Sequence, residues 1–315
     1  MIKTALAPET LSRCQPSDRS MITMKTADLF KEKTVFSFEI FPPRKDTPIE
    51  SIYATLEALR DMTPDFISVT YSASGRSNTD ATLAIASRIK NEYHTESVAH
   101  LTCINHTRDE VRDLLLELKE NNIENILALL GDPIPGITPR EDFKHASDLV
   151  SFIKANSDLN VLAACYPEGH PAAPDLDIDI RHLKTKVDAG VDHLITQLFF
   201  DNAYFYQFRD KITATGIHVP VEVGIMPVIN KAQAERVISM CGVHLPKKFR
   251  SMMDRFADNP EALRDAGLAY AVEQIIDLLA NGVDGIHLYT MNNSLVAHRI
   301  DEAVRTLIKS GSWKS

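Results

Sequence analysis

Short apolar, β-branched runs alternate with longer amphipathic stretches along this chain, and that alternation limits its fold more than any other feature. The runs have the length and composition of strands: Thr34–Phe41, Phe66–Tyr71, Ser97–Thr102, Asn125–Leu130, Val161–Tyr166, His193–Phe199, Val221–Met226 and Gly285–Tyr289. Stretches of helical length lie between them, at 48–61, 77–91, 107–121, 142–156, 178–189, 202–215, 230–241 and 260–280, and a last one covers 294–309. Because parallel neighbours need a crossover helix, eight such repeats predict an α/β fold, a closed parallel (β/α)8 TIM barrel.

A doubly wound open sheet uses the same alternation with fewer strands. The barrel is favoured because the chain has eight strand candidates and lacks a G-x-G-x-x-G after an early strand. An additional helical stretch at 246–257 falls between the seventh and eighth strands, where barrels often insert helices.

Several predicted helices are bounded by residues that favour helix ends. Thr107, Asp142 and Asn202 stand near helix starts as candidate capping residues. Gly190 and Gly282 follow predicted helices and precede strands, as glycines at helix C-termini commonly do.

The length of 315 residues fits one barrel of roughly 250 residues with additions. We expect residues 1–26 to form a loosely ordered N-terminal arm and residues 27–311 to form a single barrel domain that is catalytic. The net charge of −9 argues against a nucleic-acid-binding or acidic-membrane surface, which needs clustered Lys and Arg.

The apolar runs are too short to span a bilayer, and residues 1–30 do not have the pattern of a secretory signal. Cys14, Cys103, Cys165 and Cys241 lie far apart, without a C-x-x-C pair or a Cys–His ligand spacing. These features predict a cytoplasmic protein with reduced thiols and no bound metal.

Polar residues gather where the strands end, which is where barrels of this type place their active sites. They lie in or just after six strands: Glu39, Thr70, Tyr71, His100, Thr102, Asp132, Tyr166, Glu168, His170 and Gln197. Each has an ordinary structural interpretation by itself, such as a salt bridge, a turn or a packed ring. However, each buried polar group without a partner costs about 1–3 kcal/mol of stability. The presence of so many polar residues near one rim of the barrel therefore predicts a functional site.

Eight motifs occur in the order and spacing of one enzyme family over roughly residues 34–300. They are S-F-E-I-F-P-P-R (37–44), F-I-S-V-T-Y (66–71), A-H-L-T-C (99–103), G-D-P (131–133), C-Y-P-E-G-H-P (165–171), H-L-K-T-K-V-D-A-G (182–190), I-T-Q-L-F-F-D (195–201) and G-I-M-P-V (224–228). The chain resembles the methylenetetrahydrofolate reductases, and specifically their short bacterial form. The first, fifth and seventh motifs together are specific to that family.

The resemblance implies a barrel with bound FAD that reduces 5,10-methylenetetrahydrofolate to 5-methyltetrahydrofolate with NADH or NADPH, which supplies methyl groups for methionine synthesis. Glu39 matches the general acid that protonates folate N10, a role that needs a carboxyl kept protonated by apolar surroundings. Phe38, Ile40 and Phe41 flank it in the sequence. Asp132 matches the carboxylate that stabilises the cationic iminium at N5 and tunes the flavin.

Gln197 and Gln233 match substrate-contacting positions of the family, the former for folate and nicotinamide in turn. Lys186 is expected to face the FAD diphosphate. The full FAD set implied by the resemblance is Thr70, Tyr71, Ala73, His100, Gly131, Asp132, Ala146, Tyr166, His170, Ala173, Asp179, His182 and Lys186. The implied partner is a small-molecule folate, and members of the family commonly form homo-oligomers.

The chain departs from the family at several positions near these ligands. Leu130 and Asn293 stand where many members have arginine, Thr185 replaces a basic residue of some members, and Val237 replaces an aromatic residue of others. These departures are the support for one alternative, a non-catalytic barrel that binds a flavin or a pterin. A second alternative is a metal-dependent barrel hydrolase or aldolase that uses His100, Asp132 and His170. It is disfavoured because the first strand lacks a His-x-His pair.

Overall fold

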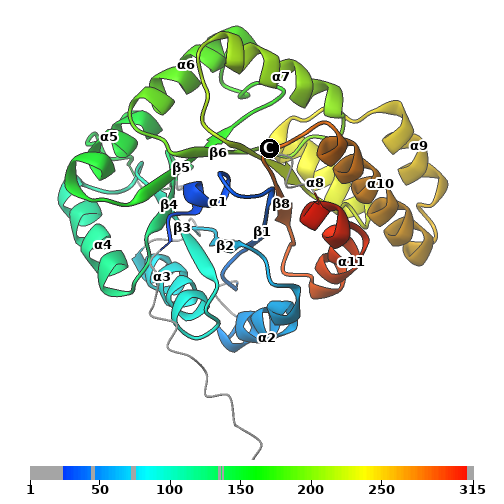
Figure 1. The fold of residues 1–315 in the computed structure, drawn as a ribbon, viewed down its shortest axis with the longest axis horizontal. Helices are drawn as coiled ribbons and strands as arrows, with labels where there is room; N and C mark the ends of the chain where they lie inside the picture. The colour runs from blue at the N-terminus through cyan, green and yellow to red at the C-terminus, as the bar shows by residue number, and fades with distance from the viewer. Residues whose placement is uncertain (1–23, 44–46, 72–75, 134–135, 137, 311–315) are drawn as a thin grey trace, which may run out of the picture.

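The computed structural model describes residues 24–43, 47–71, 76–133, 136 and 138–310. Eight parallel strands form one closed barrel in the order β1-β2-β3-β4-β5-β6-β7-β8, which confirms the predicted fold (Figure 1). The strands are β1 (Val35–Ile40), β2 (Phe66–Val69), β3 (Glu96–Thr102), β4 (Asn125–Leu129), β5 (Asn160–Cys165), β6 (His193–Thr196), β7 (Val221–Ile225) and β8 (Gly285–Tyr289).

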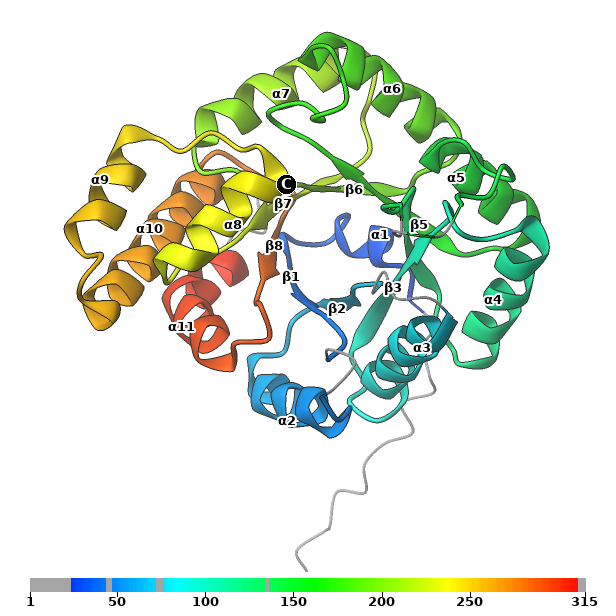
Figure 2. The same ribbon diagram turned by 180° about the vertical axis from the view of Figure 1, so that it is seen from behind.

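Helices surround the barrel on all sides, and Figure 2 shows the same ring from behind. They are α2 (Glu50–Leu59), η1 (Arg60–Met62), α3 (Arg76–Asn91), α4 (Arg108–Glu120), α5 (Ala146–Asn156), α6 (Leu176–Asp188), α7 (Asn202–Ala214), α8 (Lys231–Cys241), α9 (Lys247–Arg255), α10 (Pro260–Ala280) and α11 (Ser294–Ser310). The predicted extra helix is α9, which lies outside the ring beside α10 (Figure 2).

The predicted helix ends are partly confirmed. Thr107 caps α4 in a capping box with Glu110. Asp142 does not cap α5, because the helix begins four residues later and the Asp142 carboxylate accepts a hydrogen bond from the backbone N–H of Arg108. For α7 the cap is Asp201, one residue before the predicted Asn202.

Each strand has one face toward the helices and one toward the barrel axis, since successive side chains alternate. In β1, Phe36, Phe38 and Ile40 belong to the apolar core that the strands share with the helices. Ser37 and Glu39 have the opposite parity and contact side chains of other strands across the interior. Polar residues of odd parity in β1 therefore meet inside the barrel.

A short helix, α1 (Thr26–Leu29), closes the end of the barrel at which the strands begin, and it lies at the centre of the ring in Figure 1. The Thr26 backbone N–H donates to Asn125 Oδ1 at 2.8 Å, and Asn160 Nδ2 donates to Thr26 Oγ1 at 2.9 Å. Phe30 packs on the ring of His193 at 4.8 Å between centroids. Most of the expected arm, residues 1–26, lies outside the described residues, but Thr26 is buried as part of the barrel floor.

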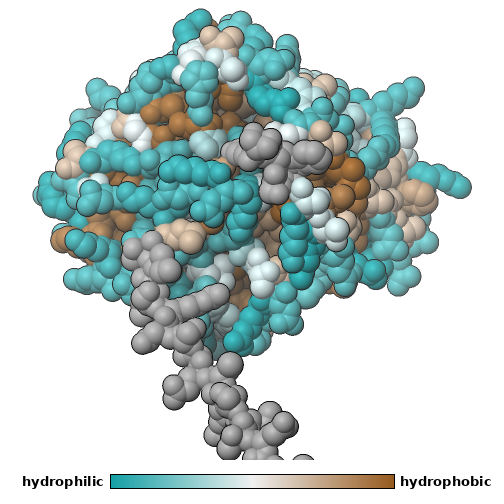
Figure 3. All heavy atoms as spheres, viewed as in Figure 1, coloured by the Kyte–Doolittle hydropathy of each residue, from teal (hydrophilic) through white to brown (hydrophobic). Residues whose placement is uncertain are grey.

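The surface seen in Figure 3 is mostly hydrophilic, with hydrophobic atoms showing in the hollows between helices. Among the described residues, no helix has the length and apolar character needed to cross a membrane.

Candidate active site at the carboxyl end of the barrel

Glu39 lies on the inner wall of β1, near the end at which the strands finish. Its Oε2 is 3.6 Å from Nε2 of His100 on β3 and 3.6 Å from Nε2 of His287 on β8. The Glu39 side chain keeps 18% of its surface exposed, whereas the two imidazoles are buried. The carboxyl group is thus partly exposed, with one imidazole from β3 and one from β8 each 3.6 Å away.

The sequence neighbours of Glu39 do not surround its carboxyl group. Phe38 and Ile40 are fully buried, but they point outward into the core shared with the helices. The expectation of an apolar environment is therefore wrong for this side chain, because adjacent residues of a strand face opposite sides. The side chains that lie next to the carboxyl group are His100 from β3 and His287 from β8.

Burial lowers the pKa of His100 to about 4, although the nearby Glu39 carboxyl raises it in part. His100 is consequently neutral at pH 7, since an imidazolium in this position would lose its hydration. Its ring can exchange a hydrogen bond with Glu39 without placing a fixed positive charge beside it.

A series of polar side chains that was not predicted from the sequence continues from Glu39 into the barrel. Ser37 Oγ lies 2.6 Å from His287 Nδ1 and also 2.6 Å from Glu222 Oε1, on β7. Ser68 Oγ of β2 is 3.4 Å from His287 Nε2. The signal that could have found them is parity: Ser37 lies two residues before Glu39, and His287 two residues before Tyr289, on the inner faces of their strands.

Tyr289 connects this carboxyl region to the next part of the site. Burial, followed by the charge of Glu39, raises the pKa of Tyr289 well above its usual range, and Tyr166 also contributes. Its hydroxyl donates to the backbone oxygen of Thr196 at 2.8 Å. A Cβ at Gly224 would lie 2.6 Å from the Tyr289 ring, so glycine is needed there for the ring to cross toward β6.

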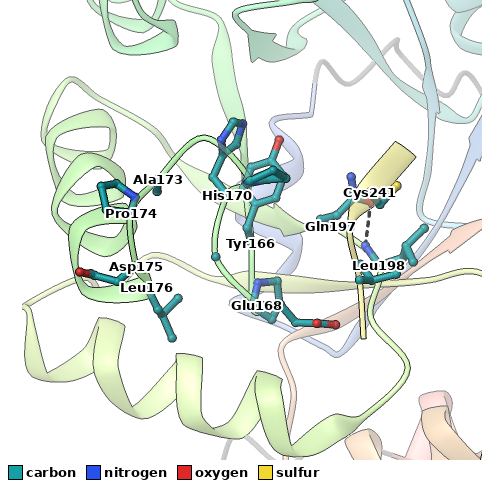
Figure 4. Close-up of a pocket in the computed structure, with 15 residues that line it drawn as sticks. Tyr166, Glu168, His170, Ala173, Pro174, Asp175, Leu176, Gln197, Leu198 and Cys241 are labelled. Atoms are coloured by element: carbon teal, nitrogen blue, oxygen red, sulfur yellow. Dashed lines mark hydrogen bonds between the residues drawn. The ribbon is translucent and has the colours of Figure 1, made fainter. Parts of the chain in front are cut away.

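A cavity of about 290 Å³ lies beyond the ends of β5 and β6 (Figure 4). Its lining includes five residues predicted from the sequence: Tyr166, Glu168, His170, Ala173 and Gln197. The rings of Tyr166 and His170 meet edge to face, with centroids 4.6 Å apart. Gln197 comes from the end of β6, where its Oε1 accepts the backbone N–H of Leu198 and leaves the side-chain NH₂ available to a ligand.

Burial, with a contribution from Asp179, raises the pKa of Tyr166 to about 12, and Asp132 adds to this effect. The phenol is therefore neutral at pH 7 and can donate a hydrogen bond.

Helix α6 places three predicted cofactor residues on one face at helical spacing: Asp179, His182 and Lys186. The Asp179 carboxylate accepts the backbone N–H of His170 at 3.1 Å, which fixes the loop that follows β5. Lys186 Nζ donates to the backbone oxygen of Ala164 at 2.6 Å, and burial lowers its pKa. His182 is exposed on the same helix.

The end of β4 carries Gly131 and Asp132. Gly131 has φ +87°, and a Cβ there would lie 2.8 Å from Thr102 Cβ, so only glycine fits this turn. Asp132 follows with an exposed side chain at the rim. Ala146 is the first residue of α5, and the N-terminal end of a helix carries a partial positive charge that favours anions.

Thr70 and Tyr71 follow β2, and both are half-buried. The Tyr71 hydroxyl lies 3.2 Å from His106 Nε2. Ala73, predicted from the same motif, falls outside the described residues.

Gln233 is not free to turn toward the cavity. Its Nε2 donates to the backbone oxygen of Pro227 at 3.2 Å, and its Oε1 accepts the N–H of Ile229 at 3.1 Å. Both ends of the amide thus fix the loop between β7 and α8, and a folate contact would use the second N–H of Nε2 or the second lone pair of Oε1.

The departures from the family motifs have local structural roles. Asn293 Oδ1 accepts the N–H of Val296 at 3.2 Å, at the start of α11. Val237 is buried among the residues that pack between α8, α9 and α10. Leu130 packs against the main apolar core.

The residues of the metal alternative do not converge. His100 is buried beside Glu39, while Asp132 and His170 are exposed on separate loops. Within the part of the chain that the structure describes, no three His, Cys, Asp or Glu side chains are grouped so as to hold a metal ion.

A carboxyl–imidazole cluster and a cavity, both at the carboxyl end of a closed parallel barrel, are features of a (β/α)8-barrel enzyme. The model of the family described as methylenetetrahydrofolate reductase matches residues 23–305. The chain belongs to the methylenetetrahydrofolate reductase family, whose named relatives are oxidoreductases.

Relatives from bacteria and plants support this assignment. The 5,10-methylenetetrahydrofolate reductase of Escherichia coli K12 is 36% identical over 284 residues, 90% of this chain and 95% of that protein. That of Pectobacterium carotovorum is 36% identical over 264 residues, 84% of this chain and 88% of the relative. Methylenetetrahydrofolate reductase (NADH) 1 of Arabidopsis thaliana is 35% identical over 85% of this chain and 49% of its own length.

A solved structure shares the fold at low sequence identity. It is described as an uncharacterized protein from Clostridium thermocellum that binds two copies of 5-methyl-5,6,7,8-tetrahydrofolic acid. Its TM-score is 0.60 at 14% identity, covering 91% of this chain and 98% of that one.

Proposed function

We propose that this protein reduces 5,10-methylenetetrahydrofolate to 5-methyltetrahydrofolate, with FAD as hydride carrier and NADH or NADPH as reductant. The observation that carries the proposal is the Glu39 carboxyl group at the barrel mouth, with His100 and His287 each 3.6 Å from its Oε2. Family membership supports the reaction, and this cluster supports the proton chemistry that the reaction needs.

Opening the five-membered ring of the substrate requires a proton on folate N10, because a neutral amine leaves far better than an anion. Glu39 is suited to supply it, since its carboxyl group faces the mouth and its partners are side chains that can accept or return a proton. His100 is neutral at pH 7 and so does not compete for the proton as a fixed cation.

Ring opening leaves a cationic iminium at N5 of the substrate, which a fixed carboxylate stabilises. Asp132 is assigned this role, as its exposed carboxyl group stands at the rim after β4. Gln197 is assigned to orient the substrate, since it lines the cavity and has a free amide NH₂.

The predicted FAD residues fit an elongated anionic ligand rather than a compact one. Those within the described residues form an arc along the ends of β2, β3, β4 and β5 and continue onto α5 and α6. Tyr166 and His170 provide ring surfaces, the start of α5 provides N–H groups, and Lys186 provides an amine held beside the arc. When bound there, FAD would accept a hydride from the nicotinamide and deliver it to the folate.

The test is a two-stage experiment on the purified protein. We expect a yellow protein whose flavin absorbance is bleached anaerobically by NADH or NADPH and restored by 5,10-methylenetetrahydrofolate, with 5-methyltetrahydrofolate as the product. A flavin that is bleached but not restored by the folate would overturn the proposed reaction. A colourless protein that does not take up added FAD would overturn the cofactor assignment.

A further inference from the structure

Glu222 is a buried carboxyl group that the proposed reaction does not use. Its exposed fraction is 0%, on the inner wall of β7, and its Oε2 has no hydrogen-bond partner within the described part of the chain. A Cβ at Gly285 would lie 3.1 Å from Glu222 Cγ, so the glycine on the neighbouring strand leaves room for it. An uncompensated acid in this position is costly, and an apolar side chain would fill the space more cheaply.

The strand register places Glu222 deeper in the barrel than Glu39, and Ser37 and His287 link the two carboxyl groups. Glu222 is paired with Gly285 at the start of β8. Two residues further along β8 toward the mouth, His287 is paired with Ser37. Two residues further still, Tyr289 is paired with Glu39. The chain runs from Glu222 Oε1 to Ser37 Oγ (2.6 Å), on to His287 Nδ1 (2.6 Å), and from His287 Nε2 to Glu39 Oε2 (3.6 Å).

The Ser37 hydroxyl has a single proton, so with a neutral imidazole the chain has two arrangements. In one, Glu222 is protonated and donates to Ser37, Ser37 donates to His287 Nδ1, and Nε2–H donates to the Glu39 carboxylate. In the other, His287 Nδ1–H donates to Ser37, Ser37 donates to the Glu222 carboxylate, and protonated Glu39 donates to Nε2.

We propose that Glu222 is a positioning residue that shares one proton with Glu39 through Ser37 and His287, and so keeps Glu39 supplied with the proton it gives to the substrate. The role of Glu222 in turnover rests on the proposed function. The sharing of a proton between Glu222 and Glu39 depends only on the protein's own side chains.

The transfer balances without any outside reagent. A proton passes from Glu222 Oε1 to Ser37 Oγ, the Ser37 proton passes to His287 Nδ1, and the Nε2 proton passes to Glu39 Oε2. Glu222 becomes a carboxylate and Glu39 a carboxylic acid, while Ser37 regains its hydroxyl and His287 changes tautomer. The last step is 3.6 Å long, so it requires the Glu39 side chain to close on His287.

The other groups around Glu222 agree with this assignment. Burial raises the pKa of Glu222 to about 7, with His287 and Ser37 opposing the shift and Asp65 adding to it. Asp65 precedes β2 and is already paired with Lys33 Nζ. His193, on β6, remains neutral because burial lowers its pKa to about 3, and His287 lowers it further. The proton that Glu222 holds is therefore one that it can release near neutral pH.

The first experiment measures the pH dependence of the folate-reducing half-reaction by anaerobic stopped flow. We expect Glu222→Gln to slow it about 10- to 100-fold at pH 7, within the range of general acid–base effects. We also expect the pH at which the rate is half-maximal to fall by at least one unit, because an anionic Glu222 no longer disfavours a second negative charge in the chain. Reduction of the flavin by the nicotinamide should keep its rate.

Matched variants separate the proton chain from simple damage. Ser37→Ala breaks the chain and should shift the pH profile as Glu222→Gln does, whereas Ser37→Thr keeps the hydroxyl and should restore it. Glu110→Gln is a carboxyl-to-amide change in the capping box of α4, outside the barrel interior, and should leave the profile in place. A half-maximal pH that does not move in Glu222→Gln and Ser37→Ala, with only a uniform loss of rate, would overturn the proposal.

The second experiment is infrared difference spectroscopy during a pH titration without substrate, which reads the C=O stretch of protonated carboxyl groups. If the proton is shared, Glu39→Gln and Glu222→Gln should each change the position or the midpoint of the remaining band. Two bands that titrate independently would overturn the proposal. Because this measurement does not depend on folate reduction, it distinguishes failure of the shared proton from failure of the proposed function.

Discussion

Glu39 and His287 stand on neighbouring strands two residues out of register, and this offset lets the imidazole Nε2 face the carboxyl Oε2 at 3.6 Å. An imidazole directly paired with Glu39 would instead lie at the position of Tyr289, at the mouth itself. The offset puts the acid between the substrate side of the barrel and a buried chain of polar groups.

Replacing Glu39 by Gln keeps the size of the side chain and removes its proton. We expect the nicotinamide half-reaction to stay near its wild-type rate and the folate half-reaction to fall by about 10²–10⁴-fold or more. Stopped-flow measurement of flavin bleaching and of its reversal by the folate gives both rates. Equal slowing of the two half-reactions would show that Glu39 has a structural role instead.

Asp132→Asn removes a negative charge from the rim after β4. The folate half-reaction should slow more than the nicotinamide half-reaction, since only the former develops a cation near this carboxyl group. The flavin should also become easier to reduce, because a nearby negative charge disfavours its reduced anionic form. Spectroelectrochemical titration measures the midpoint potential, and a potential that is unchanged or more negative in the variant contradicts the placement of Asp132.

The stability of the protein should depend on Glu222 in a definite pH range. Its pKa in the folded protein is about 7, above the ordinary 4.5, so its contribution to stability is complete below pH 4.5 and is lost as the pH rises through 7. Glu222→Gln avoids this loss and should gain up to about 3 kcal/mol relative to wild type between pH 4.5 and pH 8. Urea unfolding of both proteins at the two pH values measures the change, and a constant difference would contradict it.

His193 should make the fold sensitive to acid. Its ring is buried against Phe30, neither ring nitrogen has a hydrogen-bond partner within the described part of the chain, and burial lowers its pKa to about 3. Since the folded pKa is below the ordinary 6.5, stability is complete above pH 6.5 and declines as the pH falls toward 3.

We therefore compare the free energy of unfolding of His193→Leu with that of wild type at two pH values. The difference in favour of the variant should be about 2 kcal/mol larger at pH 5 than at pH 8. His218→Gln, at an exposed histidine, is the control and should show no such pH dependence. The measurement is the free energy of unfolding from urea titrations at both pH values. If His193→Leu behaves like the control, the imidazole is hydrated or paired in the folded protein.

Asn293 combines a helix cap with a position that the family motifs assign to a folate-binding arginine. Asn293→Arg removes the bond from Val296 N–H to Asn293 Oδ1 and should cost about 0.5–2 kcal/mol of stability. It should at the same time lower the KM for the folate roughly tenfold, through one charge-assisted hydrogen bond. Asn293→Asp keeps the cap and should do neither. A variant that loses stability without any change in KM would show that position 293 does not reach the folate.

The barrel could be predicted from the sequence because its cause is local. A β-branched run predicts each strand and an amphipathic period predicts each helix. Parallel pairing of neighbouring strands then requires a crossover helix between them. The cap at Thr107 could be predicted for the same reason, since its partner Glu110 lies within one turn of the helix.

The surroundings of Glu39 could not be predicted in this way. Its true neighbours, His100 and His287, are brought to it by barrel closure, and His287 is 248 positions away along the chain. Sequence neighbours pointed to an apolar environment, but strand geometry turns Phe38 and Ile40 to the other face. Glu222 resembled an ordinary residue of a β-branched strand until its register with Gly285 was known.

The floor of the barrel sets the route by which Glu222 can equilibrate with water. Helix α1, tied by Thr26 to Asn125 and Asn160, closes the end at which the strands begin, and the histidine above it is fully buried. The proposed relay gives a proton on Glu222 a path toward the mouth, past Ser37, His287 and then Glu39. A ligand seated over Glu39 would interrupt that exchange, and the proton count of the buried chain would then be fixed at the moment of binding rather than by the pH of the medium during turnover.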